Sequence, residues 1–388
     1  MAIPISYSWR NLVERKTTTV MTALGIGLTV AVLLAAMAMA EGLRASLNAS
    51  GHPLHVLVMR KGGTAELTSI VTRTAFQDMK LKPGVARTSS GEPMASLELV
   101  TVVILESPDR PAGININLRG LTRIGFEMRP DVRIIAGRMF EVGKRELVVG
   151  QGIESRYPEA RLGGKLRFGR GEWRVVGVVD AGGGAANSEI FADLNQLSSD
   201  QNRDDALSSV LLRATDEASL HTLIADLEND RRLNATAMTE KSYYAAQTSS
   251  AQPIRFLGMS ISLIMAIGSS FAAMNTMYAA VARRGAEIGT LRVLGFSRIG
   301  ILTSFLVESL LLAGVGGVLG ILLVLPLNGI TTGFGNMTTF SETSFQFQVT
   351  PALMLAGMVF SLTMGAMGGL FPAGSAARKE ILDALRGA

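Results

Sequence analysis

Four long apolar runs limit what this chain can fold into. They occupy residues 17–40, 254–281, 299–325 and 352–371, and the first run has no charged side chain. A helix rises about 1.5 Å per residue, so each run is long enough to cross a hydrocarbon layer of about 30 Å. Because 48% of the 388 residues are hydrophobic and only 18% are charged, the runs predict a membrane protein with four transmembrane α-helices.

The first run has an alternative interpretation as a cleaved signal peptide. Basic residues precede it, and Ala38, Met39 and Ala40 form the small-residue pattern of a cleavage site. The apolar part of a signal peptide is only about 7–15 residues long. The greater length of the run therefore favours an uncleaved span.

The charges predict which side of the membrane each connection faces. The connection at 282–298 carries four arginines and one acid, and an excess of arginine beside membrane spans is typical of cytosolic loops. These residues are Arg283, Arg284, Arg292, Arg298 and Glu287. The connection at 326–351 has no lysine or arginine, as expected outside, and the tail at 372–388 is basic again.

The overall positive charge does not predict a nucleic-acid-binding protein. Residues 41–252 contain 26 basic and 26 acidic side chains, so the net charge of +5 lies in or beside the apolar runs. Nucleic-acid binding needs basic residues clustered on one face of a folded domain. The absence of cysteine also excludes disulfides, thiolate metal sites and a cysteine nucleophile.

The region between the first two runs has a different pattern, in which short β-rich segments alternate with turns. Strands are predicted at 54–59, 97–105, 146–149, 166–168, 173–179 and 210–213, with a hairpin turn at 169–171. Helices are predicted near 69–79, 152–157 and 217–229, and residues 239–252 are predicted to form a helical stalk that leads into the second span. The fold class is thus four transmembrane helices with a large α+β extracytoplasmic domain inserted between helices 1 and 2.

The connection at 282–298 has a helical pattern of its own. Ile288, Leu291 and Leu294 recur at three-residue spacing, and Gly295 can end a helix in a left-handed turn. Two interpretations fit this pattern. The segment is either a basic amphipathic helix that merely rests on the inner membrane surface, or a helix that contacts a partner protein.

This segment resembles the signature of the MacB/FtsX-like permeases of ABC transporters. The matching residues are Val281, Arg284, Glu287, Ile288, Gly289, Arg292, Leu294 and Gly295. In that family the segment is the coupling helix that docks on the ATPase, so the resemblance implies an ATPase-coupling role for these residues from Arg284 to Gly295. Arg283 departs from the pattern, because the family usually has an acid there.

Other parts of the chain carry the same resemblance. Residues 9–12 and 22–26 are similar to the entry to the family's first span, and a stripe of Ile5, Trp9, Leu12 and Val13 predicts a short interfacial helix before it. Residues 146–150, 162–163 and 175–179 resemble the MacB-type periplasmic core domain. The end of the chain resembles the family's C-terminal motif, with Ile381 in place of the usual proline.

Three motifs have a structural as well as a functional interpretation. His52 and His55 form an HxxH pattern, but no acidic partner pattern accompanies them, which favours a linker after the first span over a metal site. Glycines 182–184 favour a mobile loop over a phosphate cradle, because no Lys-Ser/Thr pair follows. No Walker A pattern occurs in the chain: Glu159 stands where the first glycine would have to precede Gly164 and Lys165.

Two features lie inside the predicted spans. Glu308 lies about ten residues into the third run, where a carboxylate costs at least about 2.5 kcal/mol and suggests a function. The alternative is a neutral or hydrogen-bonded glutamate at a helix interface. Small residues one turn apart predict close helix packing, and these are the pairs Gly316/Gly320 and Gly365/Gly369.

These observations predict the following segments: an interfacial helix at 1–16, spans at 17–40, 254–281, 299–325 and 352–371, an extracytoplasmic core domain with stalks at 41–252, a cytosolic coupling helix at 282–298, an outer loop at 326–351 and a cytosolic tail at 372–388. The protein is expected in the cell inner membrane, with both termini in the cytosol.

The resemblance implies a permease subunit that couples ATP hydrolysis by a separate ATPase to export or extraction of an amphiphile by mechanotransmission. The substrate would be a drug, peptide, lipid or lipoprotein. The expected partners are the ATPase with its ATP and Mg²⁺, a second copy or a similar permease, the lipid bilayer and, as a further option, a periplasmic adaptor. No cofactor, metal or nucleic acid is expected on this chain itself. The alternative is a signalling module that regulates an extracytoplasmic partner such as a cell-wall hydrolase.

Overall fold

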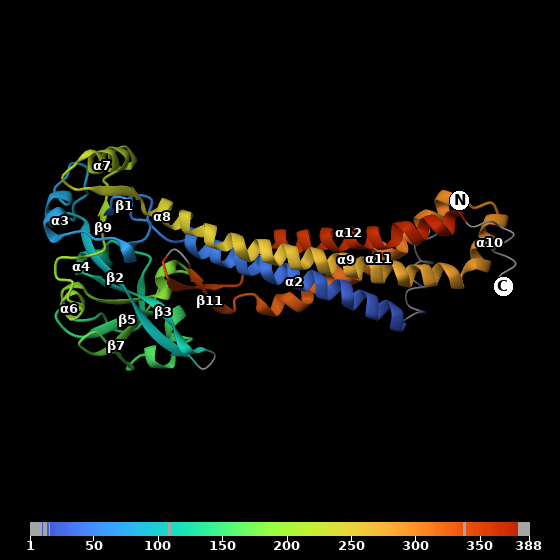
Figure 1. Cartoon of the computed structure of the whole chain (residues 1–388), viewed down its shortest axis with the longest axis horizontal. Helices are drawn as coiled ribbons and strands as arrows, with labels where there is room; N and C mark the ends of the chain where they lie inside the picture. The colour runs from blue at the N-terminus through green and yellow to red at the C-terminus, as the bar shows by residue number, and fades with distance from the viewer. Residues whose placement is uncertain (1–9, 11–13, 15, 108–109, 337–338, 379–388) are drawn as a thin grey trace. The chain divides into compact units, whose positions relative to one another are not determined.

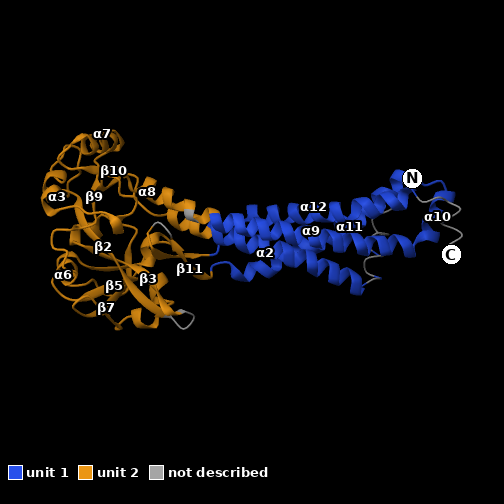
Figure 2. Ribbon diagram, viewed as in Figure 1, with its two compact units in different colours: residues 1–41, 253–329, 347–388 blue, residues 42–252, 330–346 orange. Residues whose placement is uncertain are grey.

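The computed structural model describes residues 10, 14, 16–107, 110–336 and 339–378. They form two compact units, which Figure 2 colours separately. We call residues 1–41, 253–329 and 347–388 the helical unit, and residues 42–252 and 330–346 the sheet unit. Apart from Arg10, Glu14 and Lys16, the expected interfacial helix lies outside the described residues, as does the tail from residue 379.

Four long helices make up most of the helical unit and run side by side (Figure 1). They are α2 (Lys16–Asn48), α9 (Gln252–Arg283), α11 (Arg298–Val324) and α12 (Pro351–Arg378), and each is long and apolar enough to cross a membrane. A short helix, α10 (Gly285–Val293), joins α9 to α11. The 3-10 turn η5 (Leu325–Leu327) follows α11.

Helix α12 does not end where the expected tail begins. It passes through Pro372 and continues to Arg378, although proline removes a backbone donor from a helix. Pro372 is buried, and Ala373 and Ala376 belong to an apolar cluster with residues of α9, α10 and α11. Burial of this last segment explains why the helix continues past the proline.

Glycines allow the long helices to approach closely. A Cβ atom added to Gly320 would lie 2.7 Å from Val30 of α2, and one added to Gly316 would lie 2.8 Å from Ile26. On α12, a Cβ at Gly365 would lie 2.4 Å from Ala313 of α11. A Cβ at Gly369 would contact Ser309 even more closely. The two predicted glycine pairs therefore lie at different helix interfaces.

The sheet unit is built on a ten-stranded mixed sheet in the order β10-β1-β9-β2-β3-β8-β5-β7-β4, with β6 paired to β7. Its strands are β1 (His55–Arg60), β2 (Ala95–Ser107), β3 (Arg110–Leu121), β4 (Arg133–Gly137), β5 (Glu146–Gly150), β6 (Lys165–Phe168), β7 (Gly171–Asp180), β8 (Glu189–Asp193), β9 (Ser209–Arg213) and β10 (Ala235–Thr239). Most pairs are antiparallel, while β3–β8 and β5–β7 are parallel.

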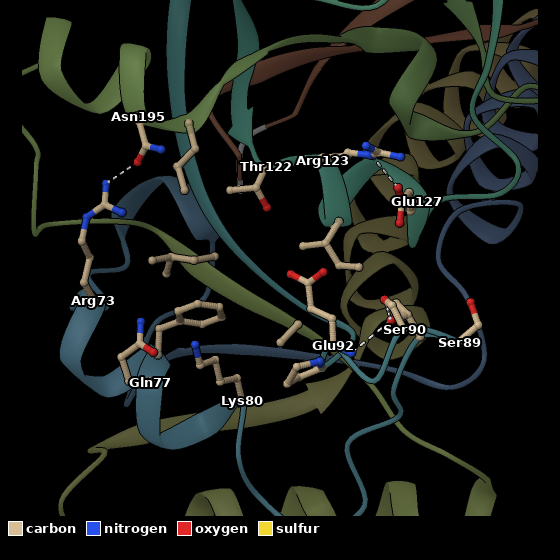
Figure 3. Close-up of a pocket in the computed structure, with 17 residues that line it drawn as sticks. Arg73, Gln77, Lys80, Ser89, Ser90, Glu92, Thr122, Arg123, Glu127 and Asn195 are labelled. Carbon is tan, nitrogen blue, oxygen red and sulfur yellow. Dashed lines mark hydrogen bonds and ion pairs between the residues drawn. The ribbon is translucent and has the colours of Figure 1, made fainter. Parts of the chain in front are cut away.

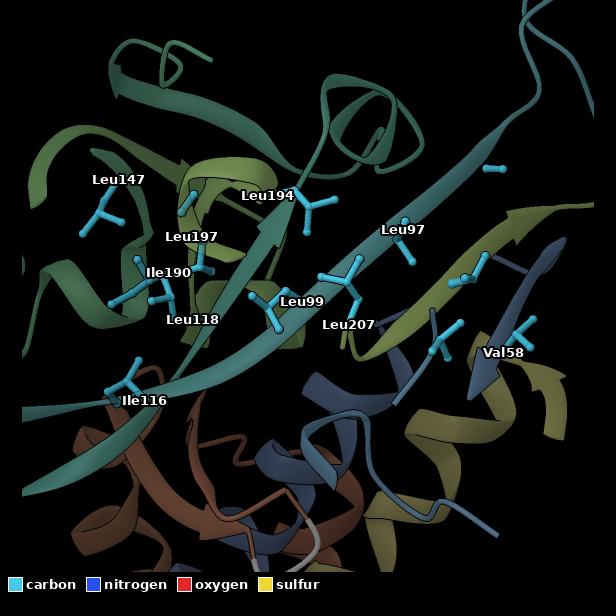
Figure 4. Packing of buried hydrophobic residues seen from close by; sticks show 14 of the residues in the cluster. Val58, Leu97, Leu99, Ile116, Leu118, Leu147, Ile190, Leu194, Leu197 and Leu207 are labelled. Atoms are coloured by element: carbon cyan, nitrogen blue, oxygen red, sulfur yellow. The ribbon is translucent and has the colours of Figure 1, made fainter. Parts of the chain in front are cut away.

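Short helices cover the sheet. They are η1 (Glu66–Thr68), α3 (Arg73–Met79), α4 (Arg123–Glu127), α5 (Gln151–Glu154), η2 (Pro158–Ala160), η3 (Ala185–Ser188), α6 (Leu194–Asp200), α7 (Glu217–Asn229), α8 (Glu240–Gln247) and η4 (Thr248–Ala251). Leucine, isoleucine and valine side chains from the central strands form the buried core, and Figure 4 shows part of it. Because β2 reaches from β9 to β3, this core is continuous along the sheet.

The structure confirms the α+β character of this region and corrects several details. All six predicted strands are present, and the predicted hairpin turn is confirmed by a left-handed Gly169 between β6 and β7. The helices expected at 69–79 and 152–157 are shorter. The sequence prediction missed the strands β3, β4, β8 and β10.

The connection expected as an outer loop at 326–351 is largely ordered. It forms an antiparallel hairpin of β11 (Thr331–Asn336) and β12 (Ser341–Gln346), which belongs to the sheet unit. Glu342 accepts hydrogen bonds from Arg156 and Tyr157, and Ser344 pairs with Ser188. These bonds to distant residues explain why the segment folds with the sheet.

Candidate functional site

Helix α10 begins and ends at residues that the sequence singles out. Arg284 interrupts the helical conformation between α9 and α10, with φ −102° and ψ 21°. At the other end Gly295 has φ +89°. The N–H of Gly295 donates to the carbonyl of Arg292, and the N–H of Phe296 donates to that of Leu291. This is the Schellman pattern of a helix C-terminus, so the predicted role of Gly295 in ending the helix is confirmed.

One face of α10 packs into the helical unit. Ile288 is 2% exposed and Gly289 is buried. Ile288 belongs to an apolar cluster whose other buried members are Met277, Val281, Ile301, Phe305, Ala373 and Ala376. This cluster joins residues of α9, α10, α11 and α12. Ile288 and Gly289 therefore hold the short helix in place and are not accessible to a partner.

Arg284 points into the same interior and joins two residues that the sequence analysis treated separately. Its Nη1 donates to Oε2 of Glu308 at 3.0 Å, and its Nε donates to Oε2 of Glu287 at 3.0 Å. The guanidinium also lies over the ring of Phe305, 5.1 Å from its centre. The side chains of Arg284 and Glu308 are only 7% and 5% exposed. Glu308 is thus a paired carboxylate at a helix interface.

The opposite end of α10 is exposed and apolar. Val293 is 63% exposed, Leu294 is 66% exposed and Ile299, just beyond the turn, is 73% exposed. We call these three residues the exposed tip. Gly295 lies in the turn between them and is exposed as well. Glu287 is mostly exposed, whereas Arg292 is half-buried.

Five of the seven predicted coupling residues therefore divide into two groups, while Glu287 is exposed at the start of α10 and Arg292 is half-buried. Arg284, Ile288 and Gly289 face the interior of the helical unit, and Leu294 and Gly295 face outward. Leu294 does not share the buried face of Ile288, because six residues at about 100° each place the two side chains about 120° apart around a helix. Exposure makes Val293 and Ile299 further candidate contact residues that the sequence analysis did not name.

A second cluster of charged residues is buried in the sheet unit. Arg119 of β3 donates five hydrogen bonds of 2.7–2.9 Å to the carboxylates of Glu66, Glu98 and Glu189. Arg129 donates two more to Glu98. Burial alone would raise the pKa of Glu98, but the charges of Arg129 and Arg119 outweigh burial and lower this pKa to about 2. The glutamates correspondingly raise the pKa values of both arginines against the effect of burial.

Of the two histidines of the HxxH motif, His55 belongs to this buried region, whereas His52 is half-buried and lies in the predicted linker, between the end of α2 and the start of β1. His55 begins β1 and is 1% exposed, and its Nδ1 lies 2.8 Å from Oε2 of Glu240. The backbone N–H of His52 donates to the same oxygen. Burial raises the pKa of Glu240, and the hydrogen bond from His55 reverses this and lowers it. Glu240 begins α8, so local spacing gave no sign of this acidic partner.

A cleft of about 690 Å³ lies on the sheet unit between α3, α4 and the start of α6 (Figure 3). At one side of the cleft Arg73 donates a hydrogen bond to Asn195, and at the other side Arg123 donates one to Glu127. Eleven of its seventeen lining residues are polar or charged, with both signs present. A cleft of this size can hold a small ligand, but its polar lining does not suit a lipid tail.

Within the described residues, no group of three or more histidine or acidic side chains could hold a metal ion. The glycines at 182–184 form a turn in which Gly182 and Gly183 have positive φ. The next residues form the short 3-10 turn η3. The turn at 182–184 therefore leads into a 3-10 turn and not into the N-terminus of a helix that could bind a phosphate.

Two family models together match most of the chain. A model of the MacB-like periplasmic core domain matches residues 19–230, and a model of the FtsX-like permease C-terminal region matches residues 259–381. The crystal structure of the periplasmic region of MacB from Actinobacillus actinomycetemcomitans is 12% identical and covers 53% of this chain and 96% of that one, with a TM-score of 0.38.

Several relatives are named macrolide export ATP-binding/permease protein MacB. The one from Bradyrhizobium diazoefficiens is 27% identical over 297 residues, which is 71% of this chain and 44% of the relative. The one from Hahella chejuensis is 22% identical over 407 residues, which is 97% of this chain and 59% of the relative. The chain thus spans about half the length of these two relatives.

Proposed function

The chain belongs to the family of ABC transporter permeases that combine a MacB-like periplasmic core domain with an FtsX-like C-terminal region, and from this premise we propose that it couples ATP hydrolysis by an ATPase partner to export or extraction of an amphiphilic substrate. The family and the four apolar helices indicate a multi-pass inner-membrane protein. Because several relatives are named for macrolide export, a drug-like amphiphile is the first substrate class to test. Peptides, lipids and lipoproteins follow.

The topology we propose has the sheet unit outside and both termini in the cytosol. The arginines around α10 support it, because such residues collect on the cytosolic side of membrane spans. The sheet unit contains all the described strands, and its larger part, residues 42–252, lies between the first two spans in sequence. Movement of the helices would then reach the outer domain through α2 and through the succession of α9, η4 and α8.

The observation that carries the proposal is the exposed tip, which the end of α10 and the start of α11 form together. Val293, Leu294 and Ile299 present apolar side chains beside arginines, and an apolar group with a polar rim marks an interaction surface. Their exposure on a short turn suits insertion into a groove of the ATPase. In this model the ATPase supplies the nucleotide and Mg²⁺ site, and α10 passes its movement to the spans.

We propose a second copy of the chain, or a similar permease, as the other membrane partner. The outward faces of α9 and α12 carry many exposed apolar side chains, among them Phe256, Ile264 and Leu355. These faces suit either lipid or another set of helices. A periplasmic adaptor would complete the assembly on the outer side. The family assignment favours this transport role over the signalling alternative.

The experiment that tests the proposal changes the exposed tip. We expect Leu294→Asp to abolish copurification of ATP hydrolysis with the tagged chain from its own host, because a charged group cannot enter an apolar groove without a large desolvation cost. Val142→Asp is the matched control, since Val142 is 73% exposed on the sheet unit. Membrane insertion and abundance should be normal in both variants. If Leu294→Asp retains normal ATP hydrolysis and transport, the tip is not the coupling contact.

A further inference from the structure

We propose that Arg284 and Glu308 form a buried latch that fixes the direction of α10 on α11, which makes Glu308 a positioning residue for the coupling helix rather than a proton carrier. The inference rests on the proposed coupling role of α10 and adds to it. It explains why a carboxylate is present inside the third apolar run.

The latch joins three successive elements through one side chain. Arg284 is the residue at which α9 ends and α10 begins, and no side-chain hydrogen bond caps α10 at that point. Its guanidinium instead reaches forward to Glu287 in the first turn of α10 and across to Glu308 of α11, at 3.0 Å in each case. The contact with the ring of Phe305, also on α11, fixes the plane of the guanidinium.

Helix α10 depends on such contacts for its direction. It has nine residues, and an isolated helix of fewer than about 12–15 residues is marginal in water. Its other anchors are Ile288, which packs in the apolar cluster, and the buried Gly289. Apolar packing at these two neighbouring residues does not fix the rotation of the helix about them. The ion pair to Glu308 supplies a second fixed point, so α10 and α11 move as one body.

The latch and the exposed tip lie at opposite ends of α10. Leu294 and Val293 lie at the C-terminal end of α10, whereas Arg284 lies at its N-terminal end. A push on the exposed tip would therefore turn α10 about its anchors. With the latch intact, that movement is passed to α11 at Glu308, and without it α10 can turn alone.

The latch and a proton carrier make opposite demands on residue 308. A proton carrier must have a titratable side chain there, whereas the latch needs only two side chains that fit each other. Replacing both members of a buried ion pair with apolar residues of similar size is often tolerated, whereas replacing one member takes a charged partner away from the other. A pair of single variants and their double variant can therefore distinguish the two roles.

The test uses Arg284→Met, Glu308→Met and the double variant of the full chain in lipid nanodiscs. Because the chain has no cysteine, spin labels can be placed at Thr290→Cys on α10 and Met367→Cys on α12, both of which are exposed. We expect a narrow distance distribution in the unchanged chain, a broad one in each single variant and a narrow one again in the double variant. Arg255→Met, an exposed arginine of α9, is the control and should have no effect.

The same variants are then assayed for ATP-driven transport in the assembled complex. Each single variant should lose at least tenfold in activity, and the double variant should recover most of it. A double variant as inactive as the worse single variant, with a narrow label distance, would show that Glu308 has a chemical role and would overturn the latch. Unchanged distances in both single variants would also overturn it. The distances are measured on the permease alone, so they remain decisive even if α10 docks on no ATPase.

Discussion

At the scale of single residues, Arg119 shows how the sheet unit tolerates buried charge. A guanidinium has five N–H donors, and the five hydrogen bonds from Arg119 go to three glutamates. Ser209 donates a further bond to Glu66. An unpaired buried charge would be very costly, so each member of this network depends on the others. The network joins η1, β2, β3 and β8, which are far apart in sequence.

The lowered pKa of Glu98 predicts how the sheet unit responds to acid. The folded-state value is about 2 against an ordinary value of 4.5, so the stabilisation is complete above about pH 4.5 and is lost as the pH falls toward 2. Its size is roughly 3 kcal/mol. We expect Glu98→Gln to remove this part of the acid sensitivity and to lower stability at neutral pH, because Arg129 loses its carboxylate partner.

Trp173 provides the measurement for this prediction. It is fully buried and stacked on Phe168, and the only other tryptophan of the chain is Trp9. In a Trp9→Phe background, the fluorescence of Trp173 reports unfolding of the sheet unit as the pH is lowered. Glu92→Gln, at an exposed position, is the control. If Glu98→Gln and the parent chain unfold at the same pH midpoint, Glu98 is not a source of the acid sensitivity.

At the scale of elements, local patterns predicted where helices and strands occur better than which faces they bury. Ile288 and Leu294 belong to one three-residue pattern in the sequence, but a helix places them about 120° apart, and only Ile288 is buried. The strand β3 was missed because Pro111, Gly113 and Asn115 weaken its local signal. It exists because Ile116 and Leu118 are buried between β2 and β8.

Two glycines of α12 should respond in opposite ways to the same substitution. A Cβ at Gly365 would lie 2.4 Å from Ala313, whereas a Cβ at Gly374 would meet nothing within 4 Å. Gly365→Ala must therefore push α12 away from α11, and we expect a lower melting temperature. Gly374→Ala should be neutral or stabilising by up to about 1 kcal/mol, since alanine favours helix. Thermal unfolding of both variants in nanodiscs checks this, and an equal shift in both would refute close packing at Gly365.

At the scale of the whole molecule, the number of spans and the α+β domain could be predicted because long apolar runs and alternating patterns are local properties. Contacts between distant segments could not be predicted. The pairing of Arg156 with Glu342 and of Ser188 with Ser344 makes the hairpin of β11 and β12 part of the sheet unit. The pairing of Arg284 with Glu308 could not be predicted either, because the two residues lie in separate segments, although each was a predicted functional residue.

The proposed topology gives the last prediction. Single cysteines at Ser90 and Thr222 of the sheet unit and at Thr290 of α10 would all be exposed, in a chain with no other cysteine. If the arginines hold α10 in the cytosol, an impermeant thiol reagent added outside intact cells, with any outer membrane permeabilised, should label Ser90→Cys and Thr222→Cys but not Thr290→Cys. A permeant reagent should label all three, which controls for accessibility. Labelling of Thr290→Cys by the impermeant reagent would place α10 outside and remove the basis for an ATPase contact there.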